Sequence, residues 1–198
     1  NLEVGMVTTF IGRNHKLSTN ENFKLFEEVW PPIIQYAKNK NIKIAIENCP
    51  MWFTDDEWPG GKNLFTTPQN FRRAFEIIPD QNFGINYDPS HFIWQQIDYI
   101  KPLYEFKDRI FHVHFKDIKL YKDKLDQVGI MANPLEYMAP KLPGLGDVDW
   151  AKYVSALNDI GFMGHACVEI EDNSYESSNQ CIVESVELSY RYLRQFVI

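Results

Sequence analysis

Four short apolar runs constrain the fold of this chain most strongly, because each ends in a side chain that can bind a metal. The runs cover residues 42–47, 83–88, 110–114 and 165–169. Their last residues are Glu47, Asp88, His114 and Glu169. Short, partly β-branched apolar runs are typical of buried parallel strands. Segments with helical periodicity separate them, so the carboxyl ends of the strands should share one edge of a parallel sheet.

The residue types at these four ends predict a metal centre. Carboxylates and imidazole are ligands for hard or borderline divalent metals. In a (β/α) barrel the active site lies at the carboxyl ends of the strands. Each residue taken alone is either a ligand or simply the first polar residue as the chain reaches the surface. Four ligand-type residues at equivalent positions favour the metal centre.

The chain shows five strand–helix units, the first strand covering residues 4–10, and no linker that would separate domains. Residues 1–198 are therefore expected to form one (β/α) barrel domain. A closed barrel of this type has eight strands and about 250 residues. We therefore expect the C-terminal five units of a (β/α)8 barrel, strands four to eight, truncated at the N-terminus. The alternative is an open sheet.

Composition excludes several classes of function. The chain has 198 residues, 44% of them hydrophobic, and a formal net charge of −7, which argues against a nucleic-acid or anionic-membrane surface. Its apolar runs are far shorter than the roughly 20 residues of a membrane span. The three cysteines lack the spacing of a zinc finger and are too few for a disulfide framework, so a cytoplasmic location is expected.

Three helices and two long loops are predicted from the sequence. Ser18 with Glu21 predicts a capping box for a helix to about residue 38, with a kink or a break at Pro31 and Pro32. Thr67 before a proline predicts a second helix start, and a further helix is expected over residues 97–106. Two segments are predicted to be long loops, residues 48–66 and residues 117–148. Long loops inside compact domains are usually functional.

Two pairs of residues, each containing histidine, refine the predicted site. Asp88 and His91 lie within one turn, so both can reach one site. His112 and His114 share one face of their strand, because side chains alternate along a strand. We assign His114 to the metal, while His112 is equally compatible with a hydrogen-bonded core position or a substrate contact. Lys116 continues this face and could neutralise an oxyanion, the alternative being a solvated lysine.

Two further choices remain open in the sequence. Glu169 and Glu171 share a face near the last strand, and we prefer Glu169 as the ligand because it directly follows the apolar run. Trp52 and Trp58 lie in the predicted loop over residues 48–66, where they could form a wall against a sugar, although loop packing explains them equally well. His15 and His165 have no evident role.

Five motifs together resemble the sugar phosphate isomerase/epimerase family, the xylose-isomerase-like TIM barrels. They are IEN ending at residue 48, DPSH over 88–91, HVHFKD over 112–117, PGLGDVDW over 143–150 and VEIED over 168–172. The resemblance implies one divalent ion, Mn²⁺ first with Mg²⁺, Co²⁺ or Zn²⁺ as alternatives, held by the four strand-end residues. It also implies that Glu47 and Glu169 act as acid and base and that His91 and Lys116 contact the substrate.

This resemblance implies a metal-dependent sugar isomerase or epimerase, and its chemistry is physically consistent. Isomerising a ketose removes a proton from a carbon next to a carbonyl and leaves an enediolate. A divalent ion stabilises that charge, while one glutamate takes the proton and the other returns it. The partner is therefore a small carbohydrate, and neither nucleic acid nor a membrane. A homo-oligomer is compatible with the sequence, which does not define the oligomeric state.

Three other functions were weighed. A related nuclease with three zinc ions needs extra histidine ligands, and residues 117–149 contain no histidine. A lyase or dehydratase acting on an inosose or a 3-keto-glycoside begins with the same proton abstraction, so the sequence barely separates it from an epimerase. A non-catalytic metal-binding or sugar-binding subunit is the third alternative.

Overall fold

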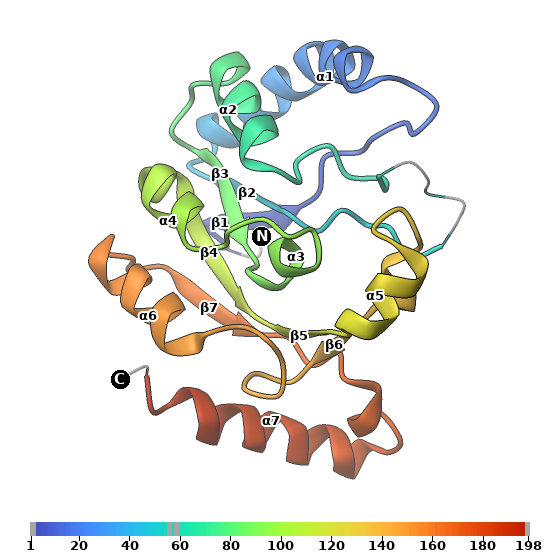
Figure 1. Ribbon diagram of the computed structural model, residues 1–198. Helices are drawn as coiled ribbons and strands as arrows, with labels where there is room; N and C mark the ends of the chain where they lie inside the picture. Colours follow the sequence, from blue (N-terminus) through green and yellow to red (C-terminus); the bar gives the residue numbers. More distant parts are fainter. Residues whose placement is uncertain (1–2, 55–56, 58–59, 197–198) are drawn as a thin grey trace. The chain divides into compact units, whose positions relative to one another are not determined.

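The computed structural model describes residues 3–54, 57 and 60–196 (Figure 1). Contacts within the chain define two compact units. The first comprises the described residues up to Tyr87 together with Asp108–His112, and the second comprises Asp88–Lys107 and the described residues from Val113 onward. The expectation of one domain over residues 1–198 stays a prediction.

The first unit is built on parallel strands. Strands β1 (Met6–Thr9), β2 (Lys43–Glu47) and β3 (Phe83–Tyr87) pair in this order, and the first half of β4 (Ile110–Phe115) follows β3 in the sheet. Consecutive side chains of β2 and β3 are buried, as expected for parallel strands covered on both faces. The register sets Glu47, the last residue of β2, opposite Asn86.

Helix α1 (Thr19–Asn39) begins at the predicted capping box, with Ser18 as N-cap and Glu21 bonding back to it. The chain does not break at the prolines, because α1 continues through Pro31 and Pro32. The alternative, a kink, stays a prediction. These prolines remove the donors to the carbonyls of Glu27 and Glu28, both of which are exposed. Water can therefore satisfy those carbonyls, and the buried face of the helix keeps it in place.

Helix α2 (Pro68–Ile77) begins at Thr67, as predicted, and lies beside α1 (Figure 1). The Arg73 guanidinium donates to Asn20 Oδ1 at 2.6 Å, which links the two helices. Below them an aromatic cluster fills the core: Phe65 stacks on Phe71 with ring centroids 4.2 Å apart, and the rings of Phe75 and Phe83 are 5.4 Å apart. This core supports the strands whose ends carry the predicted site.

The second unit contains the rest of β4, followed in the sheet by β7 (His165–Val168). The amide of Glu169 donates to the Phe115 carbonyl at 3.3 Å, so the chain still follows β4 as it leaves β7. Besides a helix in residues 117–148, this unit contains α3 (Ser90–Trp94), α4 (Lys101–Glu105), α6 (Trp150–Asp159) and α7 (Asn179–Leu193). Short 3₁₀ turns cover Lys107–Arg109 and Asn173–Tyr175.

The helix predicted over residues 97–106 was too long. Only α4 is helical there, because the Asp98 side chain accepts hydrogen bonds from the amides of Ile100 and Lys101 and forms a turn before it. Aspartate competes with helical backbone bonding in this way. The preceding helix α3 begins directly after Asp88 and Pro89 and was not predicted.

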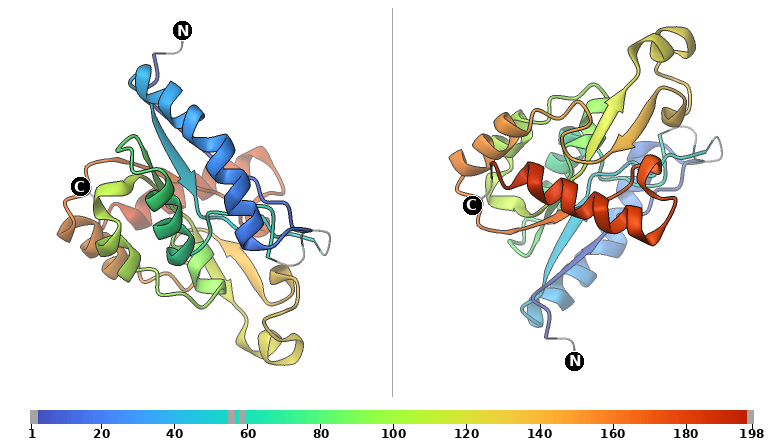
Figure 2. Two further views of the ribbon diagram at one scale, coloured as in Figure 1. Left: turned by 90° about the horizontal axis from the view of Figure 1, so that it is seen from above. Right: turned by 90° about the horizontal axis from the view of Figure 1, so that it is seen from below.

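Residues 117–148 are not a long loop, contrary to the prediction. Strands β5 (Asp117–Leu120) and β6 (Met138–Lys141) pair as an antiparallel hairpin, which carries helix α5 (Lys122–Val128) and a 3₁₀ turn, Pro134–Glu136, at its tip (Figure 2). Strands of four residues are too short to show a readable alternation in sequence. We call residues 117–148 the hairpin excursion.

In chain order, five strands are each followed by a helix: β1 by α1, β2 by α2, β3 by α3 and α4, β4 by α6 after the hairpin excursion, and β7 by α7. This is the succession of five βα units that the sequence predicted. Among the described residues, every helix is too short or too polar to cross a membrane.

Candidate metal centre

Three of the predicted ligands converge within the second unit. Asp88 follows β3, His114 lies in β4 and Glu169 follows β7. The Nδ1 atom of His114 is 3.1 Å from Glu169 Oε1 and 3.9 Å from Asp88 Oδ2. One potential ligand atom from each residue lies within 4.8 Å of those of the other two. Asp88 is fully buried, and the side chain of Glu169 is 26% exposed.

This arrangement fits a divalent ion. Ligand atoms bind such ions at about 2.0–2.6 Å, so two ligands of one ion lie at most about 5 Å apart. The separations between Asp88, His114 and Glu169 are within that limit. Two carboxylates and an imidazole suit Mn²⁺, Mg²⁺, Co²⁺ or Zn²⁺. The donor chemistry and the spacing therefore agree with the predicted metal centre.

Lys116 lies beside these ligands. Its Nζ atom is 3.3 Å from Glu169 Oε2 and 2.7 Å from Glu171 Oε2, and the residue is only 6% exposed. Burial alone would lower the pKa of Lys116, but the carboxylates of Asp88, Glu171 and Glu169 outweigh burial and raise it. Lys116 is therefore a buried cation at the edge of the acidic group, rather than a solvated lysine.

The two glutamates considered as ligands, Glu169 and Glu171, have different surroundings in the structure. Glu169 faces His114, whereas the side chain of Glu171 is 53% exposed and forms an ion pair with Lys116. His91 is buried on α3, with Nε2 3.4 Å from Asp88 Oδ2. His91 therefore joins the group that the sequence predicted around Asp88.

The first unit contains Glu47, whose role as a ligand stays a prediction. Glu47 is 9% exposed, and its backbone is held by Asn63, a residue that the sequence reasoning missed. The Asn63 amide group donates to the carbonyls of Glu47 and Cys49 at 2.8 and 2.7 Å. Its oxygen accepts from the amides of Ile11 and Phe65 at 3.2 and 3.1 Å. This side chain fixes the turn that follows β2.

His112 also belongs to the first unit. Its Nδ1 is 2.8 Å from Asn86 Oδ1, and the amide oxygen can only accept, so Nδ1 carries the proton in this contact. His112 is half-buried, which agrees with either of the two roles left open by the sequence. Trp52 is 8% exposed in the loop after β2, and Trp58 lies outside the described residues.

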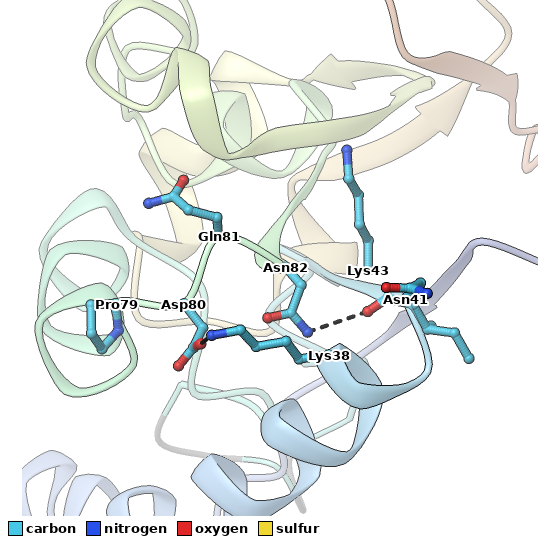
Figure 3. Close-up of a pocket in the computed structure, with 8 residues that line it drawn as sticks. Lys38, Asn41, Lys43, Pro79, Asp80, Gln81 and Asn82 are labelled. Atoms are coloured by element: carbon cyan, nitrogen blue, oxygen red, sulfur yellow. Dashed lines mark hydrogen bonds and ion pairs between the residues drawn. The ribbon is translucent and has the colours of Figure 1, made fainter.

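A cavity of about 600 Å³ in the first unit lies at the opposite ends of the strands (Figure 3). Lys43, which begins β2, and Asn82, which precedes β3, are among its lining residues, and Lys38 forms an ion pair with Asp80 across it. The five residues of β2 separate Lys43 from Glu47 by about 13 Å. This cavity is therefore separate from the strand ends that carry the predicted ligands.

Comparison with known proteins shows which protein family this chain belongs to. The family described as "Xylose isomerase-like TIM barrel" matches residues 1–193. The chain therefore belongs to the xylose isomerase-like TIM barrel family, and the predicted fold class is confirmed.

Individual relatives have several activities. The chain is 28% identical over 121 residues to inosose dehydratase of Lactiplantibacillus plantarum, covering 58% of this chain and 38% of the relative. It resembles the structure of D-psicose 3-epimerase with D-tagatose from Clostridium cellulolyticum H10 with a TM-score of 0.71 and 12% identity, over 99% of this chain and 65% of that one. It also resembles the IOLI protein with a bound zinc atom, with a TM-score of 0.68 and 19% identity, over 96% and 63%. The chain thus spans less than two thirds of the length of each.

Proposed function

We propose that this protein is a divalent-metal-dependent sugar isomerase or epimerase. It would act on a ketose or related carbohydrate by removing a proton from the carbon next to the carbonyl. The observation that carries the proposal is the convergence of Asp88, His114 and Glu169, with the buried Lys116 bound to Glu169. Membership of a family that includes epimerases, isomerases and dehydratases supports a small carbohydrate as the substrate.

The proposed metal ligands are Asp88, His114, Glu169 and Glu47. The position of Glu47 supports its inclusion, since it ends β2 and is paired in register with Asn86, two residues before Asp88. Mn²⁺ is the proposed ion, and the zinc in one structural relative supports a divalent ion in general. A bound ion would supply Lewis-acid stabilisation of negative charge developing on a substrate oxygen.

Glu169 is the proposed base. One of its oxygens faces His114, and the other forms an ion pair with the Lys116 ammonium group at 3.3 Å, which favours one orientation of the carboxylate. Neighbouring positive charge keeps a carboxylate ionised and thus able to take a proton. Glu47 is the proposed acid, which returns the proton to the opposite face or to the adjacent carbon. The proposed substrate contacts are His91, His112, Lys116 and Trp52.

A second candidate is a dehydratase acting on an inosose, and a specific observation favours it. A curated relative that aligns over more than half of this chain is an inosose dehydratase. Dehydration begins with the same proton abstraction next to a carbonyl and then expels a hydroxyl group from the neighbouring carbon. The two candidates thus use the same base and differ in the fate of the resulting enediolate.

Turnover in D₂O separates these candidates. The Mn²⁺-loaded protein is incubated with a panel of ketoses and keto-inositols, and the products are analysed by mass spectrometry and NMR. An isomerase or epimerase gives a product of unchanged heavy-atom composition with solvent deuterium at the abstracted position, whereas a dehydratase gives a product lighter by one water. Absence of both deuterium incorporation and water loss with every substrate would refute both.

Two glutamine variants test the assignment of the base. Glu169→Gln should abolish turnover and leave the fold intact, because the amide is isosteric but cannot accept the proton. Glu171→Gln is the matched control, since Glu171 also contacts Lys116 but is half exposed, and it should keep measurable turnover. Near-normal activity of Glu169→Gln would refute the assignment.

A further inference from the structure

We propose that Asp117 is a positioning residue that closes the base of the hairpin excursion and thereby holds Lys116 against Glu169 and Glu171. Its contribution to turnover rests on the proposed function, whereas its effect on the position of Lys116 does not. Asp117 is the first residue of β5 and directly follows Lys116.

The Asp117 carboxylate is fully buried and is surrounded by N–H groups. Its Oδ1 accepts from the amides of Ile118 and Val148 at 2.8 and 3.0 Å. Its Oδ2 accepts from the Gly144 amide and the Trp150 indole N–H, both at 2.9 Å. All four donors are neutral. A buried carboxylate without such bonds would be very costly, so these bonds determine where this segment of the chain can lie.

The four donors come from both ends of the hairpin excursion. Ile118 lies at its start, whereas Gly144, Val148 and Trp150 lie at its end or just beyond it. The returning chain approaches so closely that a Cβ atom on Gly146 would be 2.3 Å from Asp117 Oδ1. One carboxylate therefore joins the two ends of a segment of about thirty residues at the point where β4 ends.

Lys116 lies between two residues that both contact Trp150. The rings of Phe115 and Trp150 pack edge to face with centroids 5.3 Å apart, and Asp117 accepts the indole N–H. Side chains two apart in an extended segment share a face, and the one between them points the opposite way. Anchoring Phe115 and Asp117 on Trp150 therefore directs Lys116 toward the carboxylates of Glu169 and Glu171.

A second aspartate provides a matched control. Asp147 also fastens the hairpin excursion, because its carboxylate accepts from the Leu120 amide at 2.7 Å and pairs with Lys119 at 3.0 Å. Asp147 is exposed, and its partners Lys119 and Leu120 lie farther along the hairpin than Ile118. Asp147→Asn therefore weakens the same hairpin without disturbing the bonds around Lys116.

The direct test measures the acylation of Lys116 by a small reagent such as acetic anhydride, with peptide mass spectrometry. In Asp117→Asn the new NH₂ group faces two N–H donors, so two bonds are lost. The acylation rate of Lys116 should rise about tenfold, as expected if the two lost hydrogen bonds together contribute about 1.4 kcal/mol. Asp147→Asn should leave it unchanged. Equal rates in wild type and Asp117→Asn would overturn the proposal. If Asp117→Asn fails to fold, Trp150→Phe removes one bond and should raise the rate less, in the same direction.

Turnover gives the second readout. Asp117→Asn should lower kcat at least about tenfold, since displacement of a positioned group by about 1 Å can cost about 100-fold. In a Lys116→Met background the same change should have less than about a twofold effect, because the residue it positions is absent. Undiminished loss in that background would overturn the proposal. A wild type without turnover would refute the proposed function instead, while the acylation rates would still decide the role of Asp117.

Discussion

Replacing Asn63 by alanine should destabilise the first unit strongly. The Asn63 side chain is 1% exposed and makes four hydrogen bonds to the backbones of Ile11, Glu47, Cys49 and Phe65. Each bond contributes about 0.5–1.5 kcal/mol net, so four bonds sum to about 2–6 kcal/mol. Water entering the space left by the side chain would satisfy some of the backbone groups. We therefore expect a loss of about 2–4 kcal/mol.

Urea unfolding of the metal-free protein, followed by circular dichroism, measures this loss. Asn70→Ala is the matched control, since the Asn70 side chain donates one hydrogen bond, to the Leu64 carbonyl at 2.8 Å, and is not fully buried. Its loss should be about 1 kcal/mol. Equal losses in the two variants, or a loss below about 1 kcal/mol in Asn63→Ala, would refute the reasoning. If Glu47 is a ligand, Asn63→Ala should also weaken Mn²⁺ binding in the fraction that remains folded.

Other predictions concern packing, pH and metal. Gly84→Ala should lower the melting temperature, because its Cβ would lie 2.3 Å from a backbone carbonyl oxygen and such overpacking costs about 1–3 kcal/mol. Gly12→Ala is the control, since its Cβ would meet nothing within 4 Å. Equal melting temperatures of the two variants would contradict this. Burial raises the pKa of Asp172, but hydrogen bonds from Lys141 and a backbone amide outweigh burial and lower it. Asp172 therefore stabilises the fold above its unfolded pKa of about 3.9, and this contribution is lost as the pH falls through the lower folded value. Below pH 5 the metal-free wild type should lose more stability in urea than Asp172→Asn, and parallel curves would contradict this. Mn²⁺ at about 100 times its Kd should raise the free energy of unfolding of the wild type by about 2.7 kcal/mol and leave that of His114→Ala unchanged. An equal increase in both proteins would contradict this.

The strands and their ends were predictable because each apolar run stops at a polar residue, although β7 is largely exposed rather than buried. The ends of β2, β3, β4 and β7 fall within one residue of the predicted positions, and Asp88, His114 and Glu169 converge in the second unit as expected. Helix starts at Ser18 and Thr67 were also predictable, since capping is a local interaction.

What the sequence did not reveal depends on partners distant along the chain. The bonds of Asn63 join residues up to 52 positions apart, and those of Asp117 reach up to 33 positions. Neither side chain differs in sequence from an ordinary loop residue. The hairpin of β5 and β6 was missed for a related reason, because its short strands are stabilised by pairing with each other rather than by a local pattern.

Metal content tests the central claim most directly. The protein is dialysed against Mn²⁺, freed of unbound ion and analysed for metals, in parallel with His114→Ala. The account predicts about one equivalent of divalent ion per chain in the wild type, and its loss in the variant, because His114 lies between the carboxylates of Asp88 and Glu169. A folded wild type that takes up no ion, or a variant that retains it, would contradict the account.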